Sequence, residues 1–329
     1  MIGLFSRSIY PRRGASAVVT EELARCFERG EMVVVGGRKP FEAPVSRSPD
    51  GVEVLTLGSE LNFKGRGDRF LEPFRWILFP FHLARATSFC RRNGCDRIVA
   101  TFPDEMYLFM GLQVAKRLGV PFFAYLHNTV VENRTGWRAW LAAFVQKRAF
   151  AYATQVLVIS EGMERFYRET YPGTSFATIP HVFAGYPELN HEVPVVRGDR
   201  QKVVALCGNF NRTNLDATQR VINALHETGE YQVILYTPVP PVLLRMRGID
   251  LDKVSRVDYV ADADFMARLA EADLLVLTHG LVGGLSDVEY RTIFPTRTVS
   301  LLLAGRPLLV HAPRNSFLAD FIRQAECGL

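Results

Sequence analysis

The sequence has few of the features that mark secreted, zinc-binding or membrane-spanning proteins. Its five cysteines are scattered and form no CxxC pair, so neither a disulfide framework nor a zinc site is expected. No apolar run approaches the roughly 20 residues of a membrane-spanning helix. The longest, residues 76–84, is interrupted by Pro80 and His82. The start lacks the apolar region and cleavage site of a signal peptide. We therefore expect a soluble, cytoplasmic protein.

Signals for nucleic-acid binding are also missing, although the chain is basic. The sequence has no Lys- or Arg-rich clusters, no zinc-finger spacing and no aromatic RNA-binding motif. The net charge is +5, and the surplus lies in residues 1–200, where 26 basic residues face 20 acidic ones. Such a half suits a phosphorylated ligand or an anionic membrane surface. We expect no nucleic-acid partner.

Short apolar runs alternate with helical patterns along the 329 residues. Most runs are continuous rather than alternating, which is typical of strands that are covered on both faces. Strand–helix–strand order predicts parallel sheets with right-handed crossovers, in an α/β fold of the doubly wound kind. The predicted strands are residues 2–5, 32–35, 52–57, 97–102, 121–127, 155–160, 202–207, 231–236, 256–260, 273–278 and 307–311. The clearest predicted helices are residues 15–29, 105–118, 215–227 and 263–270.

A break in this alternation divides the chain into two domains. Residues 183–201 contain Pro187, Pro194 and Gly198 and show no periodicity. We therefore predict a domain over residues 1–185, a linker over 186–200 and a domain over 201–329. A last helix over 317–326, with Ser316 as its N-cap, is followed by Gly328, after which another strand is due. Because the chain stops at Leu329, we expect the sequence to be a fragment.

Several stretches of the sequence follow a recognisable order. They are YPRRGASAVVTEELARCFERGEMVVVGG, LQVAKRLGVPFFAYLHNT, ATQVLVISEGMERFYRETYPGTSFATIPHVF, and LAEADLLVLTHG with FPTRTVSLLLAGRPLLVHAP. Taken in this order, they resemble glycosyltransferase family 4. The resemblance covers nearly the whole chain and implies the GT-B fold, in which two Rossmann-like domains face each other across a cleft. It implies a retaining transferase of the hexosyltransferase type, which takes a sugar from a nucleotide diphosphate such as UDP or GDP. The acceptor would be a glycan, a lipid or a small molecule, as in carbohydrate or cell-envelope biosynthesis.

The resemblance implies no cofactor, and we expect metal-independent catalysis. Asp262 and Asp264 spell the DxD motif of a different sugar-transferase fold. Here they open a predicted helix, where aspartates cap the helix and complement its dipole. We therefore predict no metal site at these residues.

A donor diphosphate needs cations and free backbone N–H groups. In the predicted helix over 296–304, Thr296 is expected to be the N-cap and Arg297 to hold the diphosphate, where the family usually has lysine. A second contact is expected from the turn after the strand 202–207, which contains Gly208 and Arg212. An ordinary turn arginine on the surface is the alternative for Arg212.

The family's glutamate pair is missing. Its second member, which usually holds the ribose, corresponds to Ser300, and eight residues earlier stands Thr292. Glu289 is nearby in the sequence and is the candidate to replace this carboxylate at the ribose. His279, directly after the strand 273–278, corresponds to the position near the base or sugar.

Two residues of the first domain correspond to the family's sugar and acceptor side. His127 ends a predicted strand, and the corresponding histidine tends to contact the sugar near the reacting carbon. Gly14 lies in the loop before the first helix, where a bare backbone can approach a phosphate or sugar. A structural histidine and a simple loop glycine are the alternatives.

Two other functions fit the same architecture. One is a non-hydrolysing nucleotide-sugar epimerase, which needs acid–base carboxylates, and the other is a non-catalytic GT-B-like binding protein. Residues 74–92 and 134–152 are aromatic and basic, as in helices that lie on anionic lipid at the inner face of a membrane. Core helices with solvated edges are the alternative for both.

Overall fold

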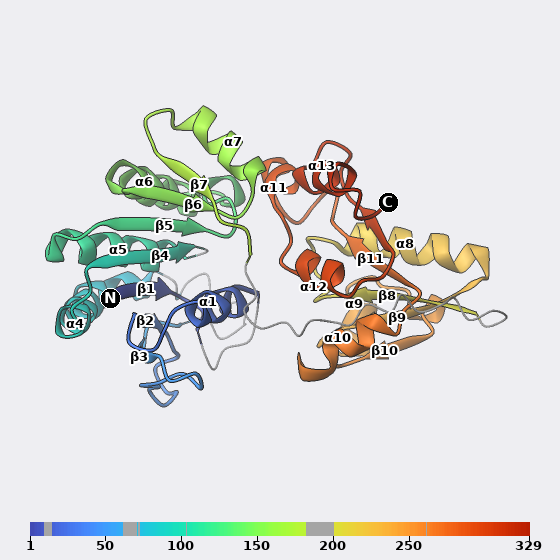
Figure 1. The fold of residues 1–329 in the computed structure, drawn as a ribbon, viewed down its shortest axis with the longest axis horizontal. Helices are drawn as coiled ribbons and strands as arrows, with labels where there is room; N and C mark the ends of the chain where they lie inside the picture. Colours follow the sequence, from blue (N-terminus) through green and yellow to red (C-terminus); the bar gives the residue numbers. More distant parts are fainter. Residues whose placement is uncertain (10–14, 62–70, 72, 103, 182–200, 261) are drawn as a thin grey trace. The chain divides into compact units, whose positions relative to one another are not determined.

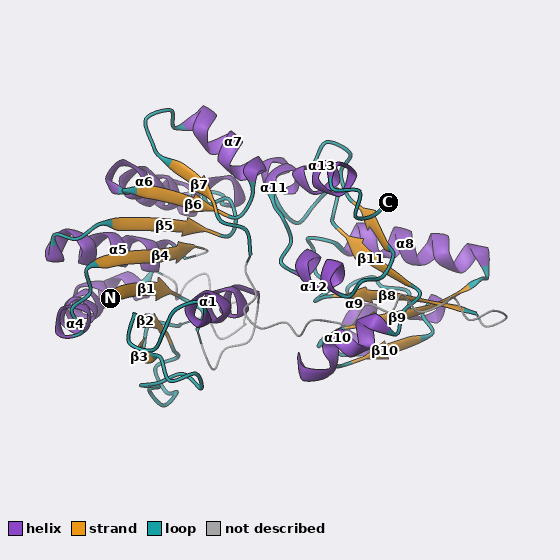
Figure 2. Ribbon diagram, viewed as in Figure 1, coloured by secondary structure: helices purple, strands orange, loops and turns teal. Residues whose placement is uncertain are grey.

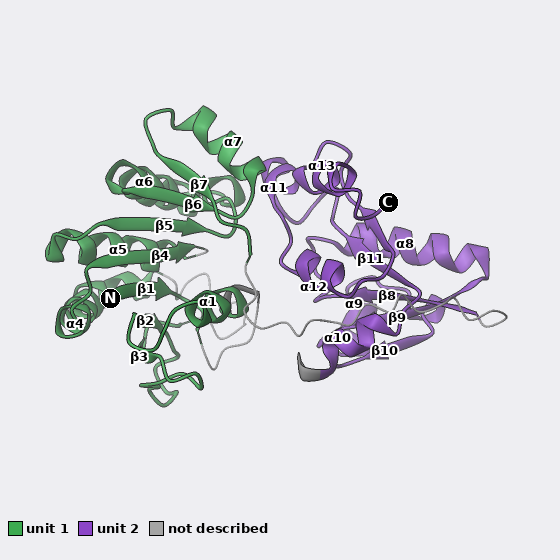
Figure 3. Cartoon of the chain, in the orientation of Figure 1, with its two compact units in different colours: residues 1–186 green, residues 187–329 purple. Residues whose placement is uncertain are grey.

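The computed structural model describes residues 1–9, 15–61, 71, 73–102, 104–181, 201–260 and 262–329 (Figure 1). The chain divides into two compact units, Met1–Tyr186 and Pro187–Leu329 (Figure 3). The predicted linker over 186–200 and the predicted site residue Gly14 lie outside the described residues.

The first unit is built on a parallel sheet of seven strands in the order β3-β2-β1-β4-β5-β6-β7. Continuous β-branched and aromatic runs form its central strands because both faces of the sheet are covered. The strands are β1 (Ile2–Ser6), β2 (Met32–Gly37), β3 (Glu53–Leu57), β4 (Arg97–Phe102), β5 (Phe122–Leu126), β6 (Gln155–Val158) and β7 (Phe176–Thr178). All are paired in parallel, so their carboxyl ends share one edge.

Helices cover this sheet (Figures 1 and 2). They are α1 (Ala15–Arg25), α3 (Phe74–Ile77), α4 (Phe79–Arg92), α5 (Glu105–Leu118), α6 (Trp137–Tyr152) and α7 (Glu161–Thr170), with a short 3-10 turn, η1, at Val131–Asn133. Helix α5 packs between α4 and α6 and contacts β1, β4 and β5. The Asp104 carboxylate caps α5 by accepting from the N–H groups of Met106 and Tyr107, and Gly119, with φ of 69°, ends it.

The second unit has a parallel sheet of five strands in the order β10-β9-β8-β11-β12. The strands are β8 (Lys202–Cys207), β9 (Tyr231–Tyr236), β10 (Arg256–Asp258), β11 (Leu274–Thr278) and β12 (Leu308–His311). The helices are α8 (Leu215–Thr228), α9 (Pro241–Met246), α10 (Asp262–Ala270), α11 (Asp287–Thr292), α12 (Arg297–Leu303) and α13 (Phe317–Gln324), with the 3-10 turn η2 at Leu251–Lys253. A buried cluster that includes Leu206, Ile222 and Leu235 joins α8 to the sheet.

The predicted α/β class with two parallel sheets is confirmed, and each predicted strand is present. Helix α1 ends at Arg25 instead of Arg29, because Glu28 and Glu31 form a turn into β2. Strand β7 was not predicted, since its three residues follow the turn residues Pro172 and Gly173. Among the described residues, no helix combines the length and hydrophobicity needed to cross a membrane.

Candidate functional site

The carboxyl edge of the second sheet brings Gly208 and Arg297 together. Arg297 begins α12, and its Nη2 donates a hydrogen bond to the carbonyl of Thr278, the last residue of β11. Gly208 follows β8 with φ of 139°, and a Cβ placed there would lie 2.7 Å from Arg297 Nη1. The guanidinium therefore lies directly on the bare backbone, which only glycine permits.

Arg297 is a cation without a carboxylate partner among the described residues. Burial lowers its pKa, and the neighbouring Cys207 counteracts this effect in part. Its Nε is buried and has no hydrogen-bond partner in the described part of the chain. Because burying an unpaired charge is costly, the arrangement is suited to an anion that supplies the missing charge.

His279 directly follows Thr278 and is buried beside this cation. One of its ring nitrogens, Nε2, lies 3.1 Å from the carbonyl oxygen of Tyr290. Burial lowers the pKa of His279 to about 4, and the charge of Arg297 adds to the effect, against the hydrogen bond to Tyr290. The ring is therefore neutral at physiological pH and bonds as an uncharged group.

The prediction that Thr296 caps this helix is wrong. Thr296 has helical backbone angles, φ −50° and ψ −39°, and its side chain makes no capping hydrogen bond. A cap needs extended geometry for its side chain to reach back to the free N–H groups. In addition, the N–H of Thr298 already donates to the carbonyl of Pro295 at 2.9 Å. Charge at this point comes from the Arg297 side chain and not from a capped helix start.

The turn after β8 holds a strained conformation. Phe210 is buried and has φ of 37°, a region that non-glycine residues rarely adopt. Arg247 fixes the turn by donating from Nη1 to the carbonyls of Asn209, at 2.8 Å, and Phe210, at 3.1 Å. Arg212 is exposed, and its Nη2 lies 3.5 Å from the carbonyl of Gly283, so its structure fits the surface-turn alternative.

Ser300 and Glu289 are both buried in the second unit. Ser300 lies one turn after Arg297 in α12, on a neighbouring face of the helix. Glu289 belongs to α11, where its N–H donates to the Ser286 hydroxyl at 3.1 Å, next to the Tyr290 that contacts His279.

Sequence reasoning missed polar atoms at the start of α8. Asn214 Nδ2 and Asp216 Oδ1 are buried without a partner among the described residues, whereas Asp216 Oδ2 accepts from the Leu281 N–H at 3.3 Å. Buried polar atoms normally have partners, so these atoms are also available to a ligand. The signal was present in the sequence, because Asn214 precedes a helical pattern directly after a strand and a glycine turn.

In the first unit, His127 follows β5 at the carboxyl edge and is buried. Neither ring nitrogen has a hydrogen-bond partner within the described ranges. Tyr125 and His181 pack against it with ring centroids 4.5 and 6.0 Å away. Burial, assisted by His181, lowers the pKa of His127 to about 3. The ring is therefore a neutral imidazole, which can donate and accept hydrogen bonds but is not protonated to act as a general acid.

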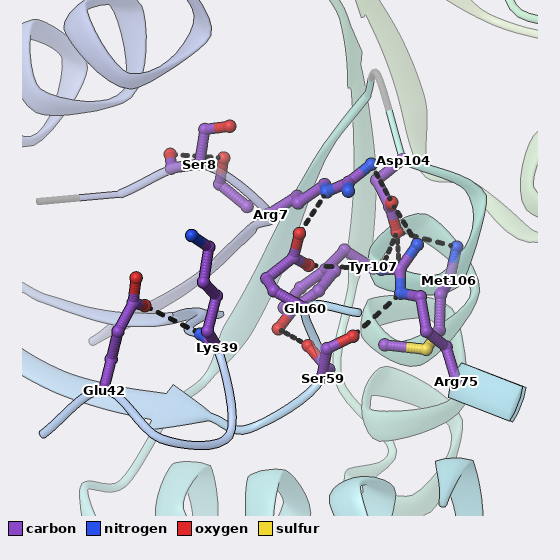
Figure 4. A network of polar contacts seen from close by, with 11 residues as sticks. Arg7, Ser8, Lys39, Glu42, Ser59, Glu60, Arg75, Asp104, Met106 and Tyr107 are labelled. Carbon is purple, nitrogen blue, oxygen red and sulfur yellow. Dashed lines mark hydrogen bonds and ion pairs between the residues drawn. The ribbon is translucent and has the colours of Figure 1, made fainter. Parts of the chain in front are cut away.

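A buried ion network occupies the same edge between β1, β3 and β4 (Figure 4). Arg75 of α3 pairs with Asp104 through two bonds, 2.9 and 3.1 Å long, and lies 3.4 Å from Glu60. Arg7 donates to Glu60 at 2.7 Å and lies 3.3 Å from Asp104. Burial alone would raise the pKa of Asp104, but Arg75 and Arg7 hold it below the ordinary value.

Two arginines and two carboxylates balance one another in this network, so it does not demand an anion as Arg297 does. Sequence reasoning did not single it out, because its members are far apart in the chain. Across the described residues, no group of three or more His, Cys, Asp or Glu side chains is arranged to hold a metal ion.

Solved structures resemble the whole chain. HepE from Anabaena, in complex with UDP and glucose, is 16% identical, with 98% of this chain and 82% of HepE covered at a TM-score of 0.61. An E. coli structure of trehalose-6-phosphate, bound with UDP-2-fluoro glucose, is 12% identical, with 94% and 84% covered at 0.59. A trehalose-6-phosphate synthase, studied for glycosyl transfer with retention, is 11% identical, with 100% and 87% covered at 0.62. At these identities the likeness establishes the fold, which is GT-B.

A comparison with curated proteins finds no match. The family model of the glycosyl transferase 4-like domain, however, matches residues 13–181, just over half of the chain. This segment contains six of the seven strands of the first sheet, including β5 with His127 at its end. The chain belongs to the glycosyl transferase 4-like family.

Proposed function

We propose that the protein is a retaining glycosyltransferase that moves a sugar from a nucleotide diphosphate to an acceptor. The observation that carries the proposal is Arg297, a cation held on the backbone of Gly208 with no described carboxylate partner. A diphosphate supplies the charge that this site lacks. HepE and the E. coli neighbour are solved with UDP or a UDP sugar, which supports UDP as the nucleotide.

In this mechanism Arg297 binds the diphosphate and stabilises the charge that develops on it when the bond to the sugar breaks. No metal ion or other cofactor is required, because the guanidinium supplies the positive charge. Gly208 positions Arg297. His279, Ser300 and Glu289 contact the nucleoside or sugar.

The sugar and the acceptor contact His127, together with Gly14, which lies outside the described residues. His127 hydrogen-bonds the sugar as a neutral ring. Retention, a hexosyl group as the sugar, and a glycan, lipid or small molecule as the acceptor are parts of the proposal. So are a cytoplasmic location and contact with an anionic membrane surface.

Calorimetry with UDP and with uridine tests the diphosphate contact in Arg297→Ala. A charge-assisted hydrogen bond contributes about 1.5–3 kcal/mol, so UDP affinity should fall about 10- to 100-fold. Uridine affinity should hardly change, because the contact is to phosphate. Arg297→Lys should recover much of the loss as a point charge. The exposed Arg220, on α8 of the same unit, provides a matched control as Arg220→Ala.

An equal loss for both ligands, or none, would remove the diphosphate from Arg297. A chain that binds no nucleotide at all would instead be a non-catalytic GT-B-like protein. If the chain interconverts the sugars of UDP derivatives without an acceptor, the epimerase alternative is correct. Product analysis by chromatography, with and without candidate acceptors, separates the epimerase from the transferase.

A further inference from the structure

Large apolar side chains are exposed on the helices α3, α4 and α6 of the first unit. Ile77, Phe81 and Trp140 are 69%, 60% and 70% exposed. Isolated exposed apolar residues are common, but a contiguous group marks an interaction surface. We call this group the aromatic patch, and its members are Phe74, Ile77, Leu78, Phe81, Trp137 and Trp140.

A chain of ring contacts makes the aromatic patch continuous. Trp76 of α3 and Phe79 of α4 lie 6.2 and 5.6 Å from Phe109 of α5, measured between ring centroids. Phe109 in turn lies 6.1 Å from Phe144 of α6, which stacks with Trp140 at 5.8 Å. The rings therefore connect α3 and α4 to α6 across α5, so the exposed side chains belong to one surface.

The three helices that carry the aromatic patch have charged residues of one sign only. Helices α3, α4 and α6 contain seven arginines and lysines and no aspartate or glutamate. Arg85 lies over the Phe81 ring at 5.7 Å, and Arg148 over the Phe144 ring at 3.5 Å. Both arginines are exposed, and neither pairs with a carboxylate in the described part of the chain. One of these seven basic residues, Arg75, is already paired in the buried ion network.

Contacts also fix which edge of the sheet the aromatic patch adjoins. Arg75 of α3 bonds to Asp104, just beyond the carboxyl end of β4. Arg134, three residues before α6, pairs at 2.6 Å with Glu105 at the start of α5. The amino ends of these helices, which carry the aromatic patch, therefore lie at the carboxyl edge of the first sheet.

We propose that the aromatic patch docks on an anionic lipid bilayer. Tryptophan and phenylalanine side chains partition into the interfacial region of a bilayer, while arginines bind lipid phosphates. Because the three helices contain basic and no acidic residues, their charge is complementary to an anionic bilayer and not to a neutral one. The role of this docking in catalysis rests on the proposed function. Docking brings the edge with His127 to the membrane, so the sugar acceptor is a lipid-anchored molecule.

Vesicle binding of the full chain tests the proposal with a built-in probe. All three tryptophans of the sequence, Trp76, Trp137 and Trp140, belong to these helices. Vesicles of phosphatidylcholine with about 30% phosphatidylglycerol should sediment the protein and shift its tryptophan emission to shorter wavelength, while phosphatidylcholine alone should bind much less. High salt should weaken the binding.

Two double variants separate the apolar and the charged contributions. Phe81→Ser with Trp140→Ser should abolish most of the binding. Arg85→Glu with Arg148→Glu should weaken it more than tenfold, because each basic residue near an anionic surface contributes about fivefold. Matched controls on the second unit are Met246→Ser, at a side chain that is 78% exposed, and Arg220→Glu.

The controls should bind vesicles as the wild type does, and every variant should keep its circular dichroism and its UDP affinity. Absence of binding to anionic vesicles, or equal binding by the patch variants, would overturn the proposal. Concentration-dependent dimers that the Ser variants abolish, without vesicle binding, would assign the patch to self-association and also overturn it. Because UDP affinity is measured separately, failure of the proposed function leaves the vesicle result interpretable.

Discussion

Acid sensitivity of the first unit is expected from His127. The ring is buried, its nitrogens have no partners among the described residues, and its pKa is lowered to about 3. In the unfolded chain the pKa returns to about 6.5. Between these two values the unfolded state binds the proton and the folded state does not. The stability that depends on neutral His127 is therefore complete above about pH 6.5 and declines as the pH falls toward 3.

The magnitude follows from the width of this window. Each pH unit below the unfolded pKa costs about 1.4 kcal/mol for one proton. Lowering the pH from about 7.5 to about 5 should therefore remove about 2 kcal/mol of unfolding free energy through His127 alone. The variant His127→Leu has a side chain of similar size and no titrating group. It should lose about 2 kcal/mol less than the wild type over the same interval.

Urea unfolding followed by tryptophan fluorescence measures this difference. The signal reports on the first unit, which contains His127, because all three tryptophans lie in that unit. Other titrating groups contribute equally to both proteins and cancel in the comparison. At neutral pH, His127→Leu should be at least as stable as the wild type, since it removes two unpaired polar atoms from the interior. Its transferase activity should fall, while UDP affinity stays unchanged, if the ring contacts the sugar.

An identical pH dependence in the two proteins would refute the reasoning, because it would mean that His127 is already accessible to protons in the folded chain. A large loss of stability in the variant at neutral pH would show that the ring nitrogens do have hydrogen-bond partners. Either result would restrict His127 to a structural role or reassign its environment.

Three further substitutions have defined outcomes. Gly208→Ala should weaken UDP binding about tenfold in calorimetry, because its Cβ would lie 2.7 Å from Arg297 Nη1 and displace the guanidinium. Glu60→Gln should cost the first unit about 3 kcal/mol in urea unfolding, since it leaves the buried Arg75 undercompensated. Ser316→Ala should cost about 1 kcal/mol in thermal unfolding of the second unit, because its hydroxyl caps α13.

The apolar runs and their alternation with helical patterns were sufficient to predict the α/β class with parallel sheets, whereas the GT-B fold was expected from the family resemblance. Continuous apolar strands such as residues 202–207 require cover on both faces, and together with the strand–helix–strand order this property predicts a parallel α/β sheet. Helix ends were less certain, as the early end of α1 shows, because a turn competes with the last helical residues. Strand β7 carries too few residues for a pattern, and its place is determined by pairing with β6.

The positions of candidate site residues could be predicted where a residue directly follows a strand. His127 and His279 follow β5 and β11, and both lie at a carboxyl edge. The structure adds what depends on three-dimensional contact, such as the support of Arg297 by Gly208, 89 positions earlier. Thr296 is a suitable residue type for a helix cap, but its backbone is helical and its side chain therefore does not cap α12. No sequence pattern distinguishes a threonine with helical backbone angles from one with extended backbone angles at this position.

The carboxyl edges of the two sheets differ in whether their buried arginines are paired with carboxylates, and this difference supports the proposed placement of the donor. At the first edge, Arg7 and Arg75 are neutralised by Glu60 and Asp104, so a ligand there is bound by hydrogen bonds and shape. At the second edge, Arg297 has no described carboxylate partner, and an anion gains its full interaction without breaking an existing ion pair. In the proposed function, the diphosphate of the donor is therefore expected at Arg297 of the second unit, and the uncharged acceptor is expected at the edge of the first unit, beside His127.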